Sequence, residues 1–192
     1  GLGWPPGLTW INPSPNAPNV NMVRCYPGMV LFEGTNLSEG RGTTHPFQMM
    51  GAPDIDFTKI LRIARDLCPD WFQGCNLRTC YFEPAFDKHA GALCHGLQIH
   101  VDNERYDHYQ FKPFRIALAL LKAIRLTRPE FDLWREGPFE YEYQRRAIDL
   151  LAGSDFTRNW VDSPNSTIRE MEEKLIYHEK QWEAIRTPFL LY

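Results

Sequence analysis

The sequence predicts an α+β domain in which a small mixed β-sheet is covered by several helices. Three observations support this. The 192 residues are enough for one domain with a sizeable core. Strand-like segments lie in the first half of the chain, and most helical segments follow them. An irregular, proline-rich stretch over residues 1–28 precedes the domain proper, residues 29–192, and we interpret it as an arm or linker remnant.

Three segments have the composition of strands. Residues 29–33 (MVLFE) are a short apolar run after the turn signal Pro27-Gly28, which predicts a buried strand. Residues 78–86 are rich in residues that favour strands. Residues 96–103 alternate apolar and polar side chains, which predicts a half-buried strand. These segments supply the predicted sheet.

Apolar residues recur every three or four positions in four other segments, which predicts four helices. The segments are residues 56–68, 112–129 and 142–155, and the stretch from Thr167 onward. The second has the broadest apolar stripe and is the predicted central helix. In the last, Trp182 and Ile185 are expected to face the body of the protein.

Local signals mark the ends of these helices. Asp56 and Thr167 precede helical segments and have side chains that cap a helix N-terminus. Glu170 follows Thr167 at the spacing of a capping box. Gly153 stands where a helix would end in a left-handed residue. Capping signals, as well as periodicity, therefore support these predicted helix boundaries.

Composition excludes several classes of function. The net charge is −3 without a basic cluster, so we expect no nucleic-acid partner. No apolar run reaches eighteen residues, so we expect no membrane span. The five cysteines include no CxxC pair, which argues against a zinc site or a disulfide framework, although Cys68 and Cys75 can bridge a loop. We therefore expect no metal site.

The segment LFEGTNLSEGRGTTHPF, residues 31–47, carries the best candidates for chemistry. Glu33 and Glu39 are carboxylates that can act as acid, base or hydroxyl acceptor. Arg41 can bind a carboxylate with two parallel hydrogen bonds. The neutral side chains offer the donors and acceptors that a sugar needs. These neutral candidates are Asn36, Ser38, Thr43 and Thr44.

His100 is a further candidate, because it lies on the polar face of its predicted strand and can line the same cleft. A structural interpretation of the whole set is equally consistent with the residues. Arg41 would then pair with a glutamate, and the Ser and Thr hydroxyls would satisfy turn backbone groups. His100 would hydrogen-bond a neighbouring strand residue.

Several longer stretches resemble one known family. They include YPGMVLFEGTNLSEGRGTTHPFQMMGAP (residues 26–53), GLQIHVDN (96–103) and DLLAGSD (149–155), and they follow the same order along nearly the whole chain. These stretches are similar to the bacterial exo-β-N-acetylmuramidase family called NamZ. The chain departs from the expected pattern at Asp54 and His45.

This resemblance implies a function and a missing partner. Family members combine a Rossmann-like N-terminal domain with a smaller α+β domain, and this chain resembles the second. They release N-acetylmuramic acid from the non-reducing end of peptidoglycan fragments, typically in the periplasm or outside the cell, without a cofactor. Glu33 and Glu39 are then the expected catalytic carboxylates, since glycoside hydrolysis commonly uses two. Arg41 is the expected clamp for the sugar's lactyl carboxylate.

Two alternatives remain open at this point. The domain can be a non-catalytic carbohydrate-binding module, or it can serve as an interaction module whose polar loop holds a partner domain. The isolated fragment is expected to be inactive if the N-terminal half supplies a catalytic partner.

Overall fold

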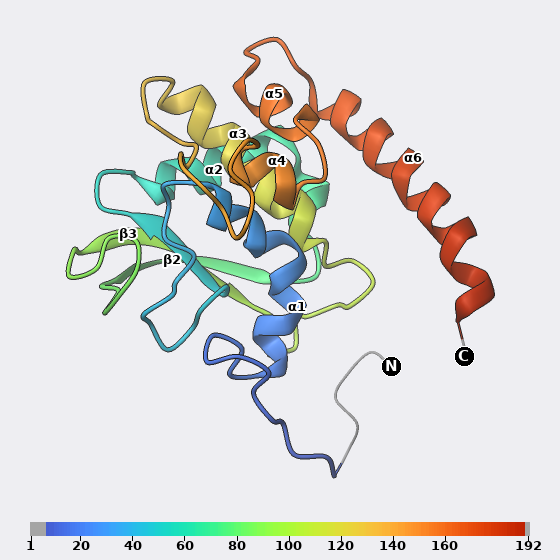
Figure 1. Cartoon of the computed structure of the whole chain (residues 1–192), viewed down its shortest axis with the longest axis horizontal. Helices are drawn as coiled ribbons and strands as arrows, with labels where there is room; N and C mark the ends of the chain where they lie inside the picture. The colour runs from blue at the N-terminus through green and yellow to red at the C-terminus, as the bar shows by residue number, and fades with distance from the viewer. Residues whose placement is uncertain (1–6, 191–192) are drawn as a thin grey trace.

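The structure, a computed structural model, describes residues 7–190 and confirms the α+β class (Figure 1). Residues 1–6 of the predicted arm lie outside this range. The helices are α1 (Val20–Met29), α2 (Phe57–Leu67), α3 (Pro113–Thr127), α4 (Ala147–Leu151), α5 (Phe156–Asp162) and α6 (Ile168–Arg186). The strands are β1 (Met49–Ala52), β2 (Asn76–Phe82) and β3 (Cys94–His100). The 3-10 helices are η1 (Val30–Gly34), η2 (Pro69–Phe72) and η3 (Thr187–Phe189).

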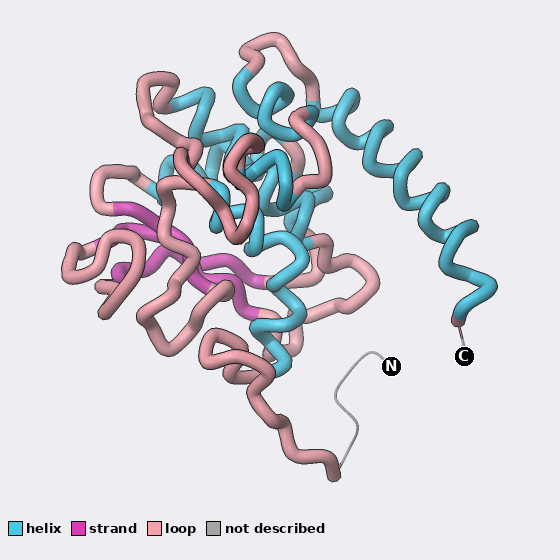
Figure 2. Tube along the Cα trace, viewed as in Figure 1, coloured by secondary structure: helices cyan, strands magenta, loops and turns pink. Residues whose placement is uncertain are grey.

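The three described strands form a sheet in the order β1-β3-β2, which packs beside the helices (Figure 2). Both pairings are antiparallel, so the prediction of a mixed sheet was wrong. The connection from β2 to β3 contains no crossover helix, and a parallel pair would require one. β2 and β3 begin two residues earlier than predicted, and the predicted sheet lacked β1.

The inner face of the sheet shares one hydrophobic core with α3, which is the central helix as predicted. Leu77, Leu97 and Ile99 of the sheet belong to one core cluster with the apolar residues of α3. Every residue of α3 from Arg115 to Ile124 is buried. The outer face carries a separate small cluster of apolar residues. This cluster consists of Met49, Cys80, Phe82 and Cys94.

The buried Lys122 shows why α3 tolerates a charge in its apolar run. Its ammonium group donates hydrogen bonds to the carbonyl oxygens of Trp160 and Ser163, at 2.9 and 2.5 Å, near the end of α5. The carbonyl groups of the last turn of a helix have no partners within the helix and attract a positive charge. Lys122 therefore joins α5 to the central helix.

The first thirty residues differ from the prediction. Residues 7–19 are irregular as expected, but Val20–Met29 is a helix, capped by Asn19. Gly28 is no turn residue: a Cβ there would lie 2.0 Å from the Pro113 carbonyl oxygen, so the glycine lets α1 approach α3 closely. Residues 29–33, the predicted strand, form the end of α1 and most of η1. A short apolar run fits a buried helix as well as a strand.

The remaining helices are confirmed in place but not always in length. Asp56 caps α2 as predicted, accepting hydrogen bonds from the backbone of Thr58 and Lys59. The segment 142–155 is helical only over Ala147–Leu151, although Gly153 has the expected positive φ of 81°. The predicted helices did not include α5. The free energy of tertiary packing outweighs weak local propensity in these short segments.

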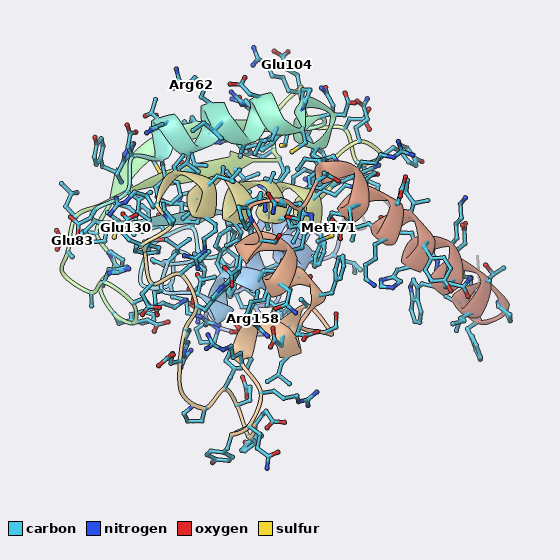
Figure 3. The ribbon with its side chains drawn as sticks, turned by 90° about the horizontal axis from the view of Figure 1, so that it is seen from above. Arg62, Glu83, Glu104, Glu130, Arg158 and Met171 are labelled. Atoms are coloured by element: carbon cyan, nitrogen blue, oxygen red, sulfur yellow. The ribbon has the colours of Figure 1, made fainter. Side chains whose placement is uncertain are left out.

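Helix α6 leaves the body of the protein, as Figures 1 and 3 both show. Thr167 caps it by accepting a hydrogen bond from the Glu170 backbone. Met171, labelled in Figure 3 where the helix begins, is its one buried residue among those described. Trp182 and Ile185 are 61% and 58% exposed, so the prediction that they face the body was wrong. All five cysteines are free, including Cys68 and Cys75.

Candidate functional site

The predicted polar loop forms one wall of a cleft of about 340 Å³. Three segments that are distant in sequence line this cleft. The first is the loop itself, and the others are the loop between β2 and β3 and the connection between α3 and α4. The lining residues are Glu33, Glu39, Arg41, Asp87, Arg135, Phe139 and Glu140. The cleft is therefore rich in charge of both signs.

Arg41 joins the two predicted catalytic carboxylates. Its Nε donates to Glu39 Oε1 at 3.0 Å, and its Nη2 donates to Glu33 Oε1. Asp87 Oδ2 is 3.8 Å from Nε. Burial lowers the pKa of Arg41, but the hydrogen bonds and charges of Glu33 and Glu39 outweigh it, so the pKa lies above its usual value. Arg41 stays charged and holds both glutamates in place.

The two glutamates differ in what they can offer a ligand. The Glu39 side chain is only 2% exposed, and both of its oxygens lie against cations. The Glu33 side chain is 12% exposed and faces the cleft. Within the described residues no hydrogen bond reaches Glu33 Oε2. Glu33 is thus the carboxylate with an oxygen available to a ligand.

Lys88 lies beneath the cleft and is absent from the set predicted from the sequence. Its Nζ is 2.7 Å from Glu39 Oε2. The same ammonium group donates to the carbonyl oxygens of Phe32, Thr35 and Leu37, at 2.8, 3.0 and 2.9 Å. These carbonyls take up its three N–H groups, so Glu39 contributes mainly an ion pair. Burial lowers the pKa of Lys88, although the charge of Glu39 acts in the opposite direction.

The backbone around Lys88 is held in an unusual conformation. Asp87 and His89, on either side, have φ of 70° and 58°, a region that residues other than glycine seldom adopt. Each such residue costs about 1–3 kcal/mol. His89 Nε2 lies 2.8 Å from the Asn36 carbonyl oxygen. Contacts of Lys88 and His89 with the polar loop therefore hold a strained turn beneath the cleft.

Gly42 brings the polar loop against the segment that leads into that turn, and Gly40 lets the loop fold back on itself near His45. Gly40 and Gly42 have φ of 80° and 78°. A Cβ at Gly42 would lie 2.7 Å from Phe86 N, and the Gly42 carbonyl accepts a hydrogen bond of 2.9 Å from Ala85 N. Only glycine combines this backbone conformation with such a close approach. The glycine content of the loop therefore fits close packing within the chain.

The neutral residues of the loop all have partners within the chain. Asn36 Nδ2 donates to the Asp132 carbonyl at 2.8 Å. The buried Ser38 hydroxyl accepts from Gly40 N, and Thr43 Oγ1 donates to the Gly40 carbonyl. Thr44 lies at the surface with its hydroxyl 2.8 Å from His45 Nδ1. Their roles in binding a sugar stay predictions, and the structure provides each with a local role.

His100 lies at the end of β3 and is not among the lining residues of the cleft. Arg78 Nε donates to its Nε2 at 3.0 Å. Burial lowers the pKa of His100, and the charges of Arg78 and His45 lower it further. The prediction that His100 binds substrate remains untested, and the structure shows it as the partner of an arginine.

A second, apolar pocket adjoins the cleft across Arg41. It has a volume of about 270 Å³. Arg41 Cζ lies 4.9 Å from the centre of the Phe47 ring. The centres of the Phe47 and Tyr26 rings are 5.0 Å apart. The remaining lining residues come from the irregular arm and α1. They are Pro13, Ser14, Asn16, Ala17, Met22 and Val23. Arg41 therefore lies between the charged cleft and the apolar pocket.

Comparison with known proteins adds to this geometry. Residues 24–192 match the family described as "Exo-beta-N-acetylmuramidase NamZ, C-terminal". The chain belongs to this family. The resemblance found in the sequence is therefore confirmed.

A relative from Bacillus subtilis (strain 168), described as peptidoglycan beta-N-acetylmuramidase NamZ, is 35% identical over 189 residues. The alignment covers 96% of this chain and 41% of the relative, so the chain spans less than half of that protein's length. Two crystal structures of DUF1343 family proteins from Bacteroides fragilis NCTC 9343 share the fold. Their TM-scores are 0.68 and 0.63 at 21% and 26% identity, covering 97% and 95% of this chain and 46% and 44% of theirs.

Sequence reasoning identified the carboxylates and Arg41 but missed half of the cleft. Arg135, Phe139 and Glu140 of the lining come from a segment with no feature that distinguishes it from an ordinary loop, and so does Lys88, the partner of Glu39. Within residues 7–190, no group of three or more His, Cys, Asp or Glu side chains is arranged to hold a metal ion. No helix in that range is long and apolar enough to cross a membrane.

Proposed function

We propose that this domain lines the substrate cleft of a peptidoglycan-acting glycoside hydrolase. The enzyme would release N-acetylmuramic acid from the non-reducing end of glycan fragments, in the periplasm or outside the cell. A Rossmann-like N-terminal domain would close the other side of the cleft. Family membership supports the reaction class, since the Bacillus subtilis relative is described as a peptidoglycan beta-N-acetylmuramidase.

One observation carries the role of this domain in that reaction. Glu33 presents an oxygen with no hydrogen-bond partner in the described residues to a cleft, while Arg41 fixes its other oxygen. A carboxylate held in one orientation can accept a proton, donate one or orient a hydroxyl group. Glu39 is buried between Arg41 and Lys88, so it acts by positioning Arg41. We therefore assign the contact with substrate to Glu33 rather than to both glutamates.

Kinetics of the full-length protein that carries this domain test the proposal. The substrate is a 4-nitrophenyl β-glycoside of N-acetylmuramic acid. Glu33→Gln is expected to lower kcat by about 100-fold or more, the usual effect of removing an acid–base group. Glu104→Gln, at an exposed position that lines a different pocket and is labelled in Figure 3, serves as the control and keeps full activity. Unchanged kinetics of Glu33→Gln would remove this residue from the reaction.

A carbohydrate-binding module is the second candidate, because Arg41, Glu39 and Lys88 neutralise one another within the chain. Such a module needs no free acid. Full-length protein that binds N-acetylmuramic acid but releases nothing from the glycoside would favour this alternative.

A further inference from the structure

Among the described residues that line the cleft, Arg135 is the cation whose charge no carboxylate neutralises. Arg41 pairs with two glutamates, and Lys88 pairs with Glu39. Within residues 7–190, no carboxylate oxygen lies within 4.0 Å of the Arg135 guanidinium, and that group donates no hydrogen bond to the chain. Arg135 is nevertheless half-buried and lines the same cleft as Glu33.

The backbone fixes Arg135 beside the polar loop. Arg135 N donates to the Gly34 carbonyl at 3.1 Å, and Trp134 forms a β-bridge with Thr35. Asn36 Nδ2 reaches the carbonyls of Asp132 and Trp134, so two adjoining segments are joined by both backbone and side chain. The position of Arg135 next to Glu33 is therefore a rigid feature of the fold.

The surroundings of the guanidinium leave it free to bind. Its Cζ lies 5.8 Å from the centre of the Phe139 ring, which supports one face of the planar group. Other acids of the cleft are engaged or turned toward solvent: Asp87 lies near Arg41, and Glu140 is exposed. A half-buried arginine with unused donors is suited to bind a carboxylate in a bidentate manner.

We propose that Arg135, rather than Arg41, binds the acidic group of the substrate. The ligand class is a sugar that carries a carboxylate, and this assignment rests on the proposed function. N-acetylmuramic acid carries its lactyl carboxylate on the sugar ring. Arg41 has less to offer, since its Nε and Nη2 donors are already used by Glu39 and Glu33.

The test compares two substrates that differ only in charge. One is the 4-nitrophenyl β-glycoside of N-acetylmuramic acid, and the other is its lactyl amide. For Arg135→Met in the full-length protein, KM for the acid is expected to rise about 10- to 100-fold, the effect of losing a charged hydrogen bond. KM for the amide should not change. Arg135→Lys should restore part of the preference.

Arg145→Met is the matched control, because Arg145 is 68% exposed and already paired with Glu142. It should leave both KM values unchanged. Equal losses on acid and amide with Arg135→Met, or an unchanged ratio between them, would overturn the proposal.

Calorimetry separates this proposal from the proposed function. If the full-length protein hydrolyses neither glycoside, the glycosidase assignment fails, and binding of free N-acetylmuramic acid becomes the readout for Arg135. Tighter binding of the acid than of its amide, lost in Arg135→Met, would support the anion site. Absence of binding by the unmodified protein, or binding that Arg135→Met leaves intact, would refute it. Unfolding temperatures confirm that each variant is folded.

Discussion

The Lys88 ammonium group lies 2.7 Å from Oε2 of Glu39, a residue that lines the cleft. The two residues come from different loops, and neither lies in a regular element. Lys88 also holds three carbonyl oxygens of the segment from Phe32 to Leu37. This one side chain therefore fixes the backbone on which Glu33 is presented.

Replacing Lys88 with Met is expected to destabilise the protein by about 3–5 kcal/mol, because it leaves the buried Glu39 Oε2 and three carbonyl oxygens without the ammonium group, while Arg41 still binds Glu39 Oε1. Urea unfolding measures the change. Lys180→Met, at an exposed position of α6, is the control and should change stability by less than about 0.5 kcal/mol. A loss below about 1 kcal/mol for Lys88→Met would mean that water replaces its contacts.

Gly42 and Gly91 allow backbone strain to be separated from close packing. Both have positive φ, 78° and 70°. An added Cβ meets nothing within 4 Å at Gly91, but it lies 2.7 Å from Phe86 N at Gly42. Gly91→Ala should lose about 1–2 kcal/mol from strain alone. For Gly42→Ala, overpacking should lower the free energy of unfolding by about 1–3 kcal/mol more than strain alone, as measured by urea unfolding. Equal losses of unfolding free energy for the two variants would show that the loop around Gly42 moves away from Phe86 at little cost.

Arg115 fastens α6 to the central helix. It is 5% exposed and binds Glu172 Oε2 at 2.9 Å and Glu179 Oε1 at 2.5 Å. Arg115→Met should weaken the attachment of α6 by about 1–2 kcal/mol, less than for a fully buried pair, because both glutamates are partly exposed. Amide hydrogen exchange over residues 168–186 should become about 10-fold faster.

Arg169→Met is the control for α6, since Arg169 pairs with Glu173 on the exposed surface of the same helix. Such a pair contributes about 0.3–0.5 kcal/mol. Exchange in α6 that responds equally to both substitutions would show that Arg115 does not anchor the helix.

The lowered pKa of His100 predicts that the stability of the protein depends on pH. Its pKa is lowered in the folded protein by burial and by the charges of Arg78 and His45, against the opposing charge of Asp102. Between the folded pKa and the unfolded value of about 6.5, the unfolded chain binds more protons. Stability is therefore complete above about pH 6.5 and falls as the pH drops through that window.

The variant His100→Asn should reduce the difference in unfolding temperature between pH 7.5 and pH 5. Titration of the His100 ring by NMR measures its pKa in the folded protein directly. A ring that titrates at or above 6.5 would contradict the prediction and the hydrogen bond from Arg78 Nε.

Local signals in the sequence were reliable where one side chain acts on its own neighbours. Asp56 and Thr167 cap α2 and α6, and Gly153 has positive φ, as predicted. Signals that depend on a distant partner were ambiguous. Pro27-Gly28 has the composition of a turn, but Gly28 lies inside α1 because α3 crosses there.

The sequence by itself determined the α+β class, the central helix, the family and the loop that carries Glu33, Glu39 and Arg41. These follow from periodicity, capping and a long polar motif, which are all properties of neighbouring residues. Only the tertiary structure decided which of the two glutamates keeps an oxygen free for a ligand and which cations lie beside it. Lys88 binds carbonyl groups more than fifty residues away, and Trp134, next to Arg135, is bound by Asn36 across 98 residues. Contacts over such separations depend on how the loops pack, and no pattern along the chain encodes them.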